Sequence, residues 1–410
     1  MEIKNHLHEV IVKRHKVLCD WICNKEDGLI VPFYSSFDIR DSGSKVATVD
    51  ANIFPAGFNN ICEADCEHAD DLARAYLDKN YGKNAKKVLL LTEEHTNNAY
   101  YWENVATLVK IVEGAGRAVR VAFPKEVDSP LNLESAGGKK ITVYSAKRDG
   151  SVVSADGFSP DLIISNNDFA NEYAEWSKGL STTINPPREM GWYRRKKSEF
   201  FKEYNAVAEE FAKLISVDPW MLQIDTEVFE NFDLSDEGRT DELANKVEDM
   251  IKRVRQRYKE RGISEKPFVF VKNNAGTYGL GIIQVGSGEE IRELNYKARK
   301  KMKAAKGGRD VSEVIIQEGI STAVLSDGMT AEPAIYLIGC QLAGGFLRVH
   351  KEKGPQENLN SPGAVYKKLC VSDLEINIHG RLLENVYGWV ARLGLLAIGR
   401  EYKSYLATKK

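Results

Sequence analysis

The chain has 410 residues, of which 43% are hydrophobic and 28% charged, so it can bury a substantial core and we expect two or three associated domains. Its 57 Lys and Arg residues nearly balance its 59 Asp and Glu residues, which gives a formal net charge of -2. This balance excludes a general electrostatic attraction for nucleic acid or anionic membranes, and any anion-binding site has to be local.

The first residues, MEIKNHLHEVIVKRHK, alternate charged and apolar side chains, and no segment has the apolar length of a signal peptide or membrane span. We therefore expect a cytoplasmic protein without membrane attachment. Six cysteines are too few for a disulfide scaffold, and a cytoplasmic location would keep them as thiols. Cys19 and Cys23 are four residues apart, as are Cys62 and Cys66, with His68 nearby. We interpret these as thiols on helix faces, because structural zinc ligands are usually more closely spaced.

The first half of the chain alternates predicted strands and helices. KKVLLLTEE, RAVRVAFP and DLIISNND have strand character, and the helical segment NVATLVKIVEGAG separates the first two. This alternation predicts a mostly parallel sheet with a ligand site beyond the carboxyl ends of its strands. Two prolines follow Asn185 and break the pattern. We therefore predict an amino-terminal α/β substrate-binding domain at residues 1–190 and a second domain at residues 191–410.

The second half predicts an α+β domain with a largely antiparallel sheet. Residues 240–261 have the pattern of an amphipathic helix, with Thr240 as N-cap and Gly262 at the end. Strand-like runs follow: FVFVKNN, GIIQV, VSEVIIQEGI, AEPAIYLIG and GGFLRVH. The Lys-rich stretch NYKARKKMKAAKGG interrupts them, and we interpret it as a solvated helix face rather than a nucleic-acid-binding arm.

A glycine-rich hairpin is the first candidate site. The strand FVFVKNN carries Lys272, and the glycine loop after it leads into another strand, unlike a Walker loop or a Rossmann fingerprint, which opens a helix. Glycines let backbone N–H groups approach phosphates, and a lysine adds a point charge. An ordinary tight turn is the alternative. The candidate nucleotide-binding residues here are Lys272, Gly276, Thr277, Tyr278, Gly279 and Gly281.

Two further segments follow the hairpin. A strand ends at Gln317 and Glu318, where a hinge can offer backbone groups to an adenine edge and a carboxylate to ribose. Arg348 lies on a later strand and could offset charge on a transferring phosphoryl group. Oxygen ligands suited to Mg2+ come next, although a polar surface turn would use the same residue types. These candidate metal ligands are Glu357, Asn358 and Asn360.

The segment FYSSFDIRDSGSKVATVDANIFPAGFNN is dense in Ser, Asp, Arg and Asn. Recognition of an amino acid requires donors for its carboxylate and acceptors for its ammonium group. A loop of capped turns would contain the same residue types. The candidate substrate-binding residues are Arg40, Ser42, Lys45, Asp50, Asn52, Asn59 and Asn60.

A strand with a lysine, a glycine hairpin and then a Gln-Glu hinge resembles the ATP-grasp fold. The strings VDANIFPAGFNN, INPPREMGW, VKNNAGTYGLGI and ENLNSPGA resemble the bacterial glutamate-cysteine ligase family that is related in architecture to glutathione synthetase. The resemblance extends through nearly the whole chain. It implies an amino-terminal parallel α/β domain followed by an ATP-grasp domain, with ATP and Mg2+ as cofactors. It also implies that glutamate and cysteine are joined into γ-glutamylcysteine, with ADP and phosphate as co-products, in the first step of glutathione biosynthesis.

The resemblance assigns ATP phosphates to Lys272 and the glycine loop, the adenine and ribose pocket to Glu318, and the metal to the stretch 357–360. Many ATP-grasp enzymes have Glu-x-Asn there, whereas this chain reads ENLN, so two asparagines remain candidates. A second nucleotide-binding lysine is usual on an earlier strand. Its candidates here are Arg195, Lys196 and Lys197.

Two other functions remain open from the sequence. Another ligase on the same scaffold, such as a glutathione synthetase, would differ only in its acceptor pocket. A nucleotide-binding regulator would bind ATP without turnover. The sequence makes no prediction of the oligomeric state.

Overall fold

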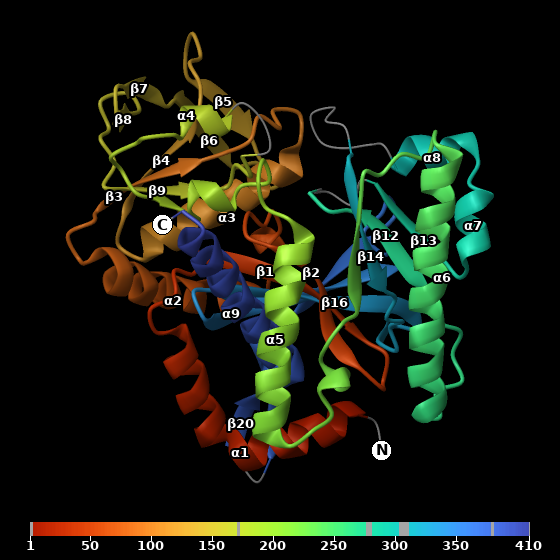
Figure 1. The fold of residues 1–410 in the computed structure, drawn as a ribbon. Helices are drawn as coiled ribbons and strands as arrows, with labels where there is room; N and C mark the ends of the chain where they lie inside the picture. Colours follow the sequence, from red (N-terminus) through yellow and green to blue (C-terminus); the bar gives the residue numbers. More distant parts are fainter. Residues whose placement is uncertain (1–2, 170–172, 276–280, 303–310, 379–380, 410) are drawn as a thin grey trace.

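The computed structural model describes residues 3–169, 173–275, 281–302, 311–378 and 381–409. These residues form three sheets of four or more strands, together with the helices that cover them. In Figure 1 the parallel sheet lies at the upper left, a small antiparallel sheet lies at the right, and a larger antiparallel sheet lies between them. The predicted combination of α/β and α+β architecture is confirmed.

The first sheet is parallel apart from one edge strand. Its strands contain apolar runs such as Val88 to Leu91, which are buried on both faces as expected of a covered parallel sheet. Helices α2 (Glu63–Tyr81) and α3 (Ala99–Gly114) pack against each other beside it. Only β5 is antiparallel to its neighbour. The strand order is β10 (Ile184–Asn185), β9 (Leu162–Ser165), β3 (Lys87–Leu91), β4 (Ala118–Phe123), β6 (Lys140–Ser145) and β5 (Leu131–Glu134).

The central sheet is antiparallel and combines distant parts of the chain. Strands β1 and β2 come from the first 52 residues, and β1 pairs with β2 on one side and with β16 on the other, so strands from both sides of residue 190 share one sheet. The division of the chain near residue 190 stays a prediction. The order is β18 (Val365–Leu369), β17 (Gln341–His350), β16 (Met329–Ile338), β1 (Tyr34–Asp41) and β2 (Val46–Asn52), and β15 (Leu325–Ser326) also pairs with β16.

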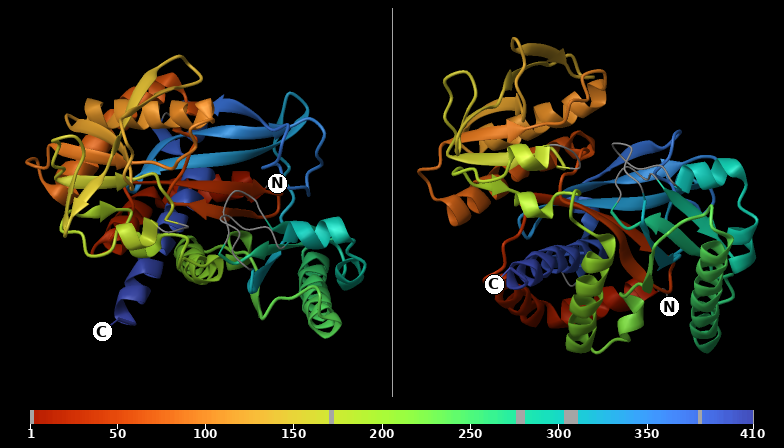
Figure 2. Two further views of the ribbon diagram at one scale, coloured as in Figure 1. Left: turned by 90° about the horizontal axis from the view of Figure 1, so that it is seen from above. Right: turned by 45° about the horizontal axis from the view of Figure 1, so that its top comes forward.

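Three long helices pack together beside the central sheet. They are α1 (Ile3–Glu26), α5 (Lys197–Ile215) and α9 (Val386–Ala407), and α9 contacts β1, β2 and β16. In both views of Figure 2, α9 lies close to the sheet and α5 lies beside α9. These helices and the two larger sheets contribute to one continuous apolar core.

The third sheet has its own core, formed with helix α6 (Glu237–Glu260). The apolar stripe predicted on this helix, including Leu243, Val247 and Val254, is buried. The predicted N-cap is wrong, because the Asp236 side chain accepts a hydrogen bond from Arg239 N, while Thr240 lies one turn inside the helix and donates to the Asp236 carbonyl. The strand order is β11 (Thr226–Glu230), β14 (Glu313–Glu318), β12 (Val269–Asn273) and β13 (Ile282–Val285), and all neighbours are antiparallel.

Shorter elements connect these layers. The Lys-rich stretch forms a helix over Tyr296–Met302, and its later residues lie outside the described ranges. No helix in the described part of the chain combines the length and apolar character needed to cross a membrane. The remaining short elements are β7 (Lys147–Asp149), β8 (Val152–Ser154), α4 (Tyr173–Trp176), α7 (Gly288–Arg292), α8 (Tyr296–Met302), β19 (Glu375–Ile378) and β20 (Arg381–Glu384).

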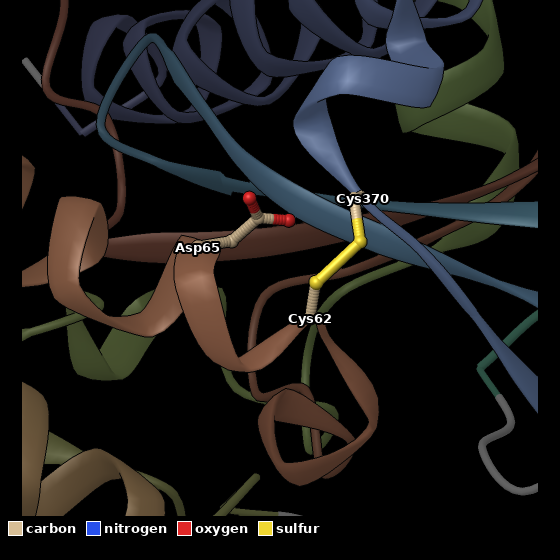
Figure 3. Close-up of side chains that lie close together, drawn as sticks. All are labelled: Cys62, Asp65 and Cys370. Carbon is tan, nitrogen blue, oxygen red and sulfur yellow. A yellow bond between two sulfur atoms is a disulfide. The ribbon is translucent and has the colours of Figure 1, made fainter.

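A disulfide joins Cys62 to Cys370 (Figure 3). The expectation that the cysteines remain thiols is therefore wrong for this pair. The two residues are 308 positions apart, and only the folded chain brings their Cα atoms to 5.1 Å, so their spacing in the sequence gave no indication of the bond. Cys19, on helix α1 as predicted, and Cys23 are free thiols.

Candidate functional site

A cluster of buried ionic side chains lies on the central sheet. Arg348 of β17 lies opposite Glu332 of β16 and binds it through Nη1. The same guanidinium binds Asp38 of β1 through Nη1 and Nη2, at 2.9 and 3.2 Å. Arg40, two residues along β1, places its Nε 2.6 Å from Glu332 Oε2. Glu332 is thus held between two guanidinium groups.

The charges in this cluster shift the pKa values of the acids in opposite directions. Burial would raise the pKa of Glu332, but Arg40 and Arg348 outweigh it and hold that pKa below its usual value. Burial raises the pKa of Asp38, and the neighbouring carboxylates Glu332 and Asp50 add to this effect against the opposing attraction of Arg348. Arg348 keeps a pKa well above its ordinary value and remains charged, because both acids outweigh its burial.

A second group of charges adjoins the cluster where the central sheet meets the small sheet. Asp50 of β2 lies directly opposite Asp38 of β1, and its Oδ1 is 2.5 Å from Lys197 Nζ. Lys272 extends from β12 and donates from Nζ to the Val49 carbonyl on β2 at 3.2 Å. Burial lowers the pKa of Lys272 to about 8, with Lys197 and Arg40 contributing in the same sense. Burial would raise the pKa of Asp50, but Lys197 and Lys272 together lower it.

The structure therefore brings Arg40, Asp50, Lys272 and Arg348 together from four strands. Sequence reasoning missed Asp38 and Glu332. Side chains two positions apart on a strand share a face, so Asp38 lies on the same face as Arg40. This spacing could have identified Asp38 as a site residue once Arg40 was a candidate. Glu332 is recognisable only from its position opposite Arg348 across the sheet.

Three neighbouring residues, Arg195, Lys196 and Lys197, were candidates for the second nucleotide-binding lysine. Of these, Lys197 reaches the cluster. Lys196 Nζ instead pairs with Glu313 at 2.6 Å. Arg195 is buried and pairs with Glu401 at 3.0 Å. Lys197 is itself buried at the start of α5, beside Asp50.

The hinge residues Gln317 and Glu318 face opposite sides of β14. The Glu318 carboxylate lies 2.7 and 2.8 Å from Lys45 Nζ and also accepts from Asp225 N at 3.0 Å. Lys45 Nζ lies 4.3 Å from the centre of the Trp220 ring, and burial lowers the pKa of Lys45. Glu318 thus borders a cavity of about 420 Å³ beside α6, and its oxygens bind protein donors.

Gln317 is fully buried, and neither its Nε2 nor its Oε1 has a hydrogen-bond partner among the described residues. The preceding Ile315, on the same face of β14, belongs to the main core, whereas Ile316 belongs to the α6 core. The Gln317 amide is therefore directed toward the side of β14 that faces the central sheet.

The predicted metal-binding stretch forms a loop held by Arg40. Arg40 Nη1 and Nη2 donate to the carbonyls of Pro355 and Glu357 at 2.8 and 2.7 Å. The Glu357 carboxylate accepts from Gly354 N at 2.7 Å, which lowers the Glu357 pKa, and it borders a cavity of about 630 Å³ that also reaches β13. Asn358 Oδ1 accepts from Asn360 N at 2.9 Å. The backbone of this loop, rather than its side chains, is joined to the ionic cluster.

Other predicted substrate-binding residues make local hydrogen bonds. The Ser42 hydroxyl accepts from Lys45 N in the turn between β1 and β2, and Asn52 Oδ1 accepts from Phe54 N. Asn59 and Asn60 bind each other at 3.2 Å in the short 3-10 helix Phe58–Asn60. These are the contacts of capped turns, and among the described residues no side-chain hydrogen bond joins these asparagines to the cluster.

The glycine hairpin is only partly described. Its base is closed by a hydrogen bond from Asn273 N to the Gly281 carbonyl at 3.1 Å, and Gly281 has a φ of 63°, which favours glycine. Gly276, Thr277, Tyr278 and Gly279 lie outside the described residues.

Comparison with known proteins identifies the family. The sequence model of the glutamate-cysteine ligase family, GshA, matches residues 8–402. A solved structure from Methylobacillus flagellatus KT, assigned as a candidate gamma-glutamylcysteine synthetase, is 34% identical with a TM-score of 0.85, covering 98% of this chain and 96% of that one. No curated protein matches.

Two more distant structures also match, each at 11% identity. D-alanyl-alanine synthetase A from Vibrio cholerae has a TM-score of 0.34, covering 78% of this chain and 81% of that one. A glutathione synthetase-like effector from Globodera pallida has a TM-score of 0.38, covering 85% and 78%. Both TM-scores are too low for these similarities to support a conclusion about this chain. The extent of the family match and the similarity to the Methylobacillus structure are decisive: the chain belongs to the glutamate-cysteine ligase family and is a ligase that joins glutamate to cysteine.

Proposed function

We propose that this enzyme activates the γ-carboxylate of glutamate with ATP inside the ionic cluster. A carboxylate is a poor electrophile, so its oxygen attacks the γ-phosphorus of ATP to give γ-glutamyl phosphate and ADP. The amine of cysteine then displaces phosphate to form γ-glutamylcysteine. The observation that supports this most directly is the convergence of Lys197, Lys272 and Arg348 on Asp38 and Asp50, where two antiparallel sheets meet. A cytoplasmic location is part of the proposal.

Three cations would bind the phosphates. Lys272 and Lys197 reach the cluster from the small sheet and from α5, so both can contact ATP held between the sheets. Arg348 is fixed by two carboxylates, but its buried Nε has no hydrogen-bond partner in the described ranges. That N–H is available to an oxygen of the transferring phosphoryl group, where a preorganised donor stabilises developing charge.

The base of ATP would be recognised at the hinge by Gln317. Its unpartnered amide offers an NH2 donor group beside a carbonyl acceptor, which suits the amino edge of adenine. The Glu318 carboxylate, in contrast, is bound to Lys45 on the other side of β14. We therefore propose that Glu318 supports the hinge through this ion pair rather than contacting ribose.

A divalent cation, which we propose is Mg2+, would be held by Asp38 and Asp50. Both are hard oxygen donors that lie opposite each other on neighbouring strands, and Asp50 helps to raise the pKa of Asp38, an effect that a cation would relieve. Each carboxylate would share its oxygens between the cation and its present partner, which is Arg348 for Asp38 and Lys197 for Asp50. When bound, the cation supplies charge neutralisation to the ATP phosphates. The stretch 357–360 remains a second candidate, although the Glu357 carboxylate already accepts from the backbone of Gly354.

The matched variants Lys272→Ala and Lys196→Ala test the proposal. Lys272→Ala should lower the ATP-dependent rate by about 2 to 4 kcal/mol in transition-state terms, since it removes a charge donor from the site. Lys196→Ala removes a neighbouring lysine that pairs with Glu313 and should leave the rate nearly unchanged. ADP formation is measured with glutamate and cysteine, and separately with γ-glutamylcysteine and glycine. Equal losses in both variants, or ADP formation only with the second substrate pair, would contradict the proposal.

A further inference from the structure

The Cys62–Cys370 disulfide joins helix α2 to the end of β18. Cys62 is the N-cap residue of α2, and Cys370 directly follows β18. Both residues are partly exposed, so a small molecule can approach them from solvent. Asp65, in the first turn of α2, accepts a hydrogen bond from Val371 N at 2.9 Å, and Figure 3 shows its carboxylate beside the disulfide. One covalent bond and one hydrogen bond therefore connect α2 to this point of the chain.

The tethered strand leads directly to the ionic cluster. Within the described residues β18 is an edge strand that pairs with β17 alone, where Tyr366 lies opposite Arg348. The loop before β18 supplies the two carbonyls that bind Arg40. The loop that leads into β18 thus contacts Arg40, a predicted substrate-binding residue, whereas Arg348 is held by Asp38 and Glu332.

We propose that this disulfide is a site of thiol–disulfide exchange with small aminothiols, and that its reduction weakens glutamate binding. The identity of the thiol rests on the proposed function, since the substrate cysteine and the product γ-glutamylcysteine are both aminothiols. A thiolate attacks one sulfur of the disulfide, forms a mixed disulfide and releases the other cysteine as a thiolate. A second thiolate attacks the mixed disulfide and releases the remaining cysteine. Two aminothiols are oxidised to one disulfide, and Cys62 and Cys370 take up their two electrons and, on protonation, two protons.

After reduction, the hydrogen bond from Val371 N to the Asp65 carboxylate still connects the end of β18 to helix α2. The end of β18 gains freedom, and the loop that binds Arg40 is held less firmly. The KM for glutamate should therefore rise several-fold, whereas ATP affinity, which depends on Lys272 and the hinge, should change little. An accumulating thiol product would in this way slow its own synthesis.

The test uses the full-length enzyme equilibrated in buffers with different ratios of cysteine to cystine. Alkylation followed by mass spectrometry measures the reduced fraction of Cys62 and Cys370, with the free thiol Cys23 as an internal control for labelling. After removal of the thiols, the KM for glutamate is measured. The expected result is that the reduced fraction and the KM rise together, while the Cys62→Ser/Cys370→Ser variant keeps the KM of the reduced enzyme at every ratio.

Two results would overturn the inference. One is complete reduction of the disulfide with an unchanged KM for glutamate, and the other is alkylation of Cys62 and Cys370 that does not change with the ratio of cysteine to cystine. The labelling does not depend on turnover, so absence of ligase activity would contradict the proposed function without affecting the measurement of exchange. Asp65→Ala gives a second test. Because Asp65 is the remaining link after reduction, this variant should raise the glutamate KM more in the reduced enzyme than in the oxidised one, and equal effects would contradict the coupling.

Discussion

The lowered pKa of Lys272, about 8, predicts that ATP binding weakens as the pH rises from 7 to 9. Burial lowers this pKa because it penalises the charged ammonium group, but the phosphates of ATP require that charge. With a pKa of about 8, roughly 90% of the free enzyme carries the proton at pH 7 and roughly 10% at pH 9. If only the protonated form binds phosphate, the apparent dissociation constant for ATP should rise about tenfold across this interval.

Isothermal titration calorimetry of ATP in the absence of cysteine is the appropriate assay, because the thiol of cysteine also titrates in this range. Bound phosphates should restore the proton, so at pH 8 binding should take up about half a proton per site. Measurements in buffers with different ionisation enthalpies report this uptake directly. Lys272→Arg provides the control, since a guanidinium does not titrate below pH 12 and its ATP affinity should be independent of pH.

A dissociation constant that stays flat from pH 7 to 9 in the wild-type enzyme, with no proton uptake, would refute the reasoning. The same pH dependence in a folded Lys272→Arg variant would assign the titration to another group. Circular dichroism establishes whether that variant is folded, and the proton uptake of the wild-type enzyme tests the prediction even if it is not.

Other consequences concern the remaining buried polar groups. Glu332→Gln removes the negative charge held between two arginines and should lower kcat at least about tenfold, as measured by steady-state kinetics with each substrate varied; an unchanged kcat would exclude a role in orienting them. Glu318→Gln leaves Lys45 without its buried partner and should lower the free energy of unfolding by about 3 kcal/mol in chemical denaturation, with ATP affinity nearly unchanged. A large loss of ATP affinity would instead favour a ribose contact. Gln317→Leu preserves the side-chain volume but removes the amide, and should cost about 1 to 3 kcal/mol of preference for ATP over GTP in competitive binding.

Local patterns predicted much of the fold. The apolar runs of the parallel sheet and the buried stripe of α6 depend on periods that can be read within one segment, and both were predicted. The N-cap of α6 was not predicted correctly, because Asp236 and Thr240 both have suitable side chains. The hydrogen bond that Arg239 N donates to the Asp236 side chain distinguishes them, and it is seen only in the structure. Lys272 and Arg348 could be proposed from the sequence because one precedes a glycine-rich hairpin and the other lies on a strand that precedes a cluster of oxygen ligands.

Contacts between distant segments could not be predicted in the same way. Asp38 and Glu332 have no sequence motif around them, and their importance comes from lying beside Arg348 across two strand pairs. The ion pair between Lys45 and Glu318 joins residues 273 positions apart. Nothing in either segment showed that the Glu318 carboxylate would be directed away from Gln317 and bound by a lysine.

The early position of β1 and β2 in the chain affects how this protein can be synthesised and divided. These strands leave the ribosome well before β16, the partner of β1 on its other side, which is complete only after residue 338 has been added. Until then the backbone N–H and C=O groups on this edge of β1 are unpaired, and they can associate with other chains. A recombinant fragment that ends near residue 190 would retain this edge permanently. Such a fragment should aggregate, and co-expression of the remaining segment should restore its solubility by supplying the missing strand.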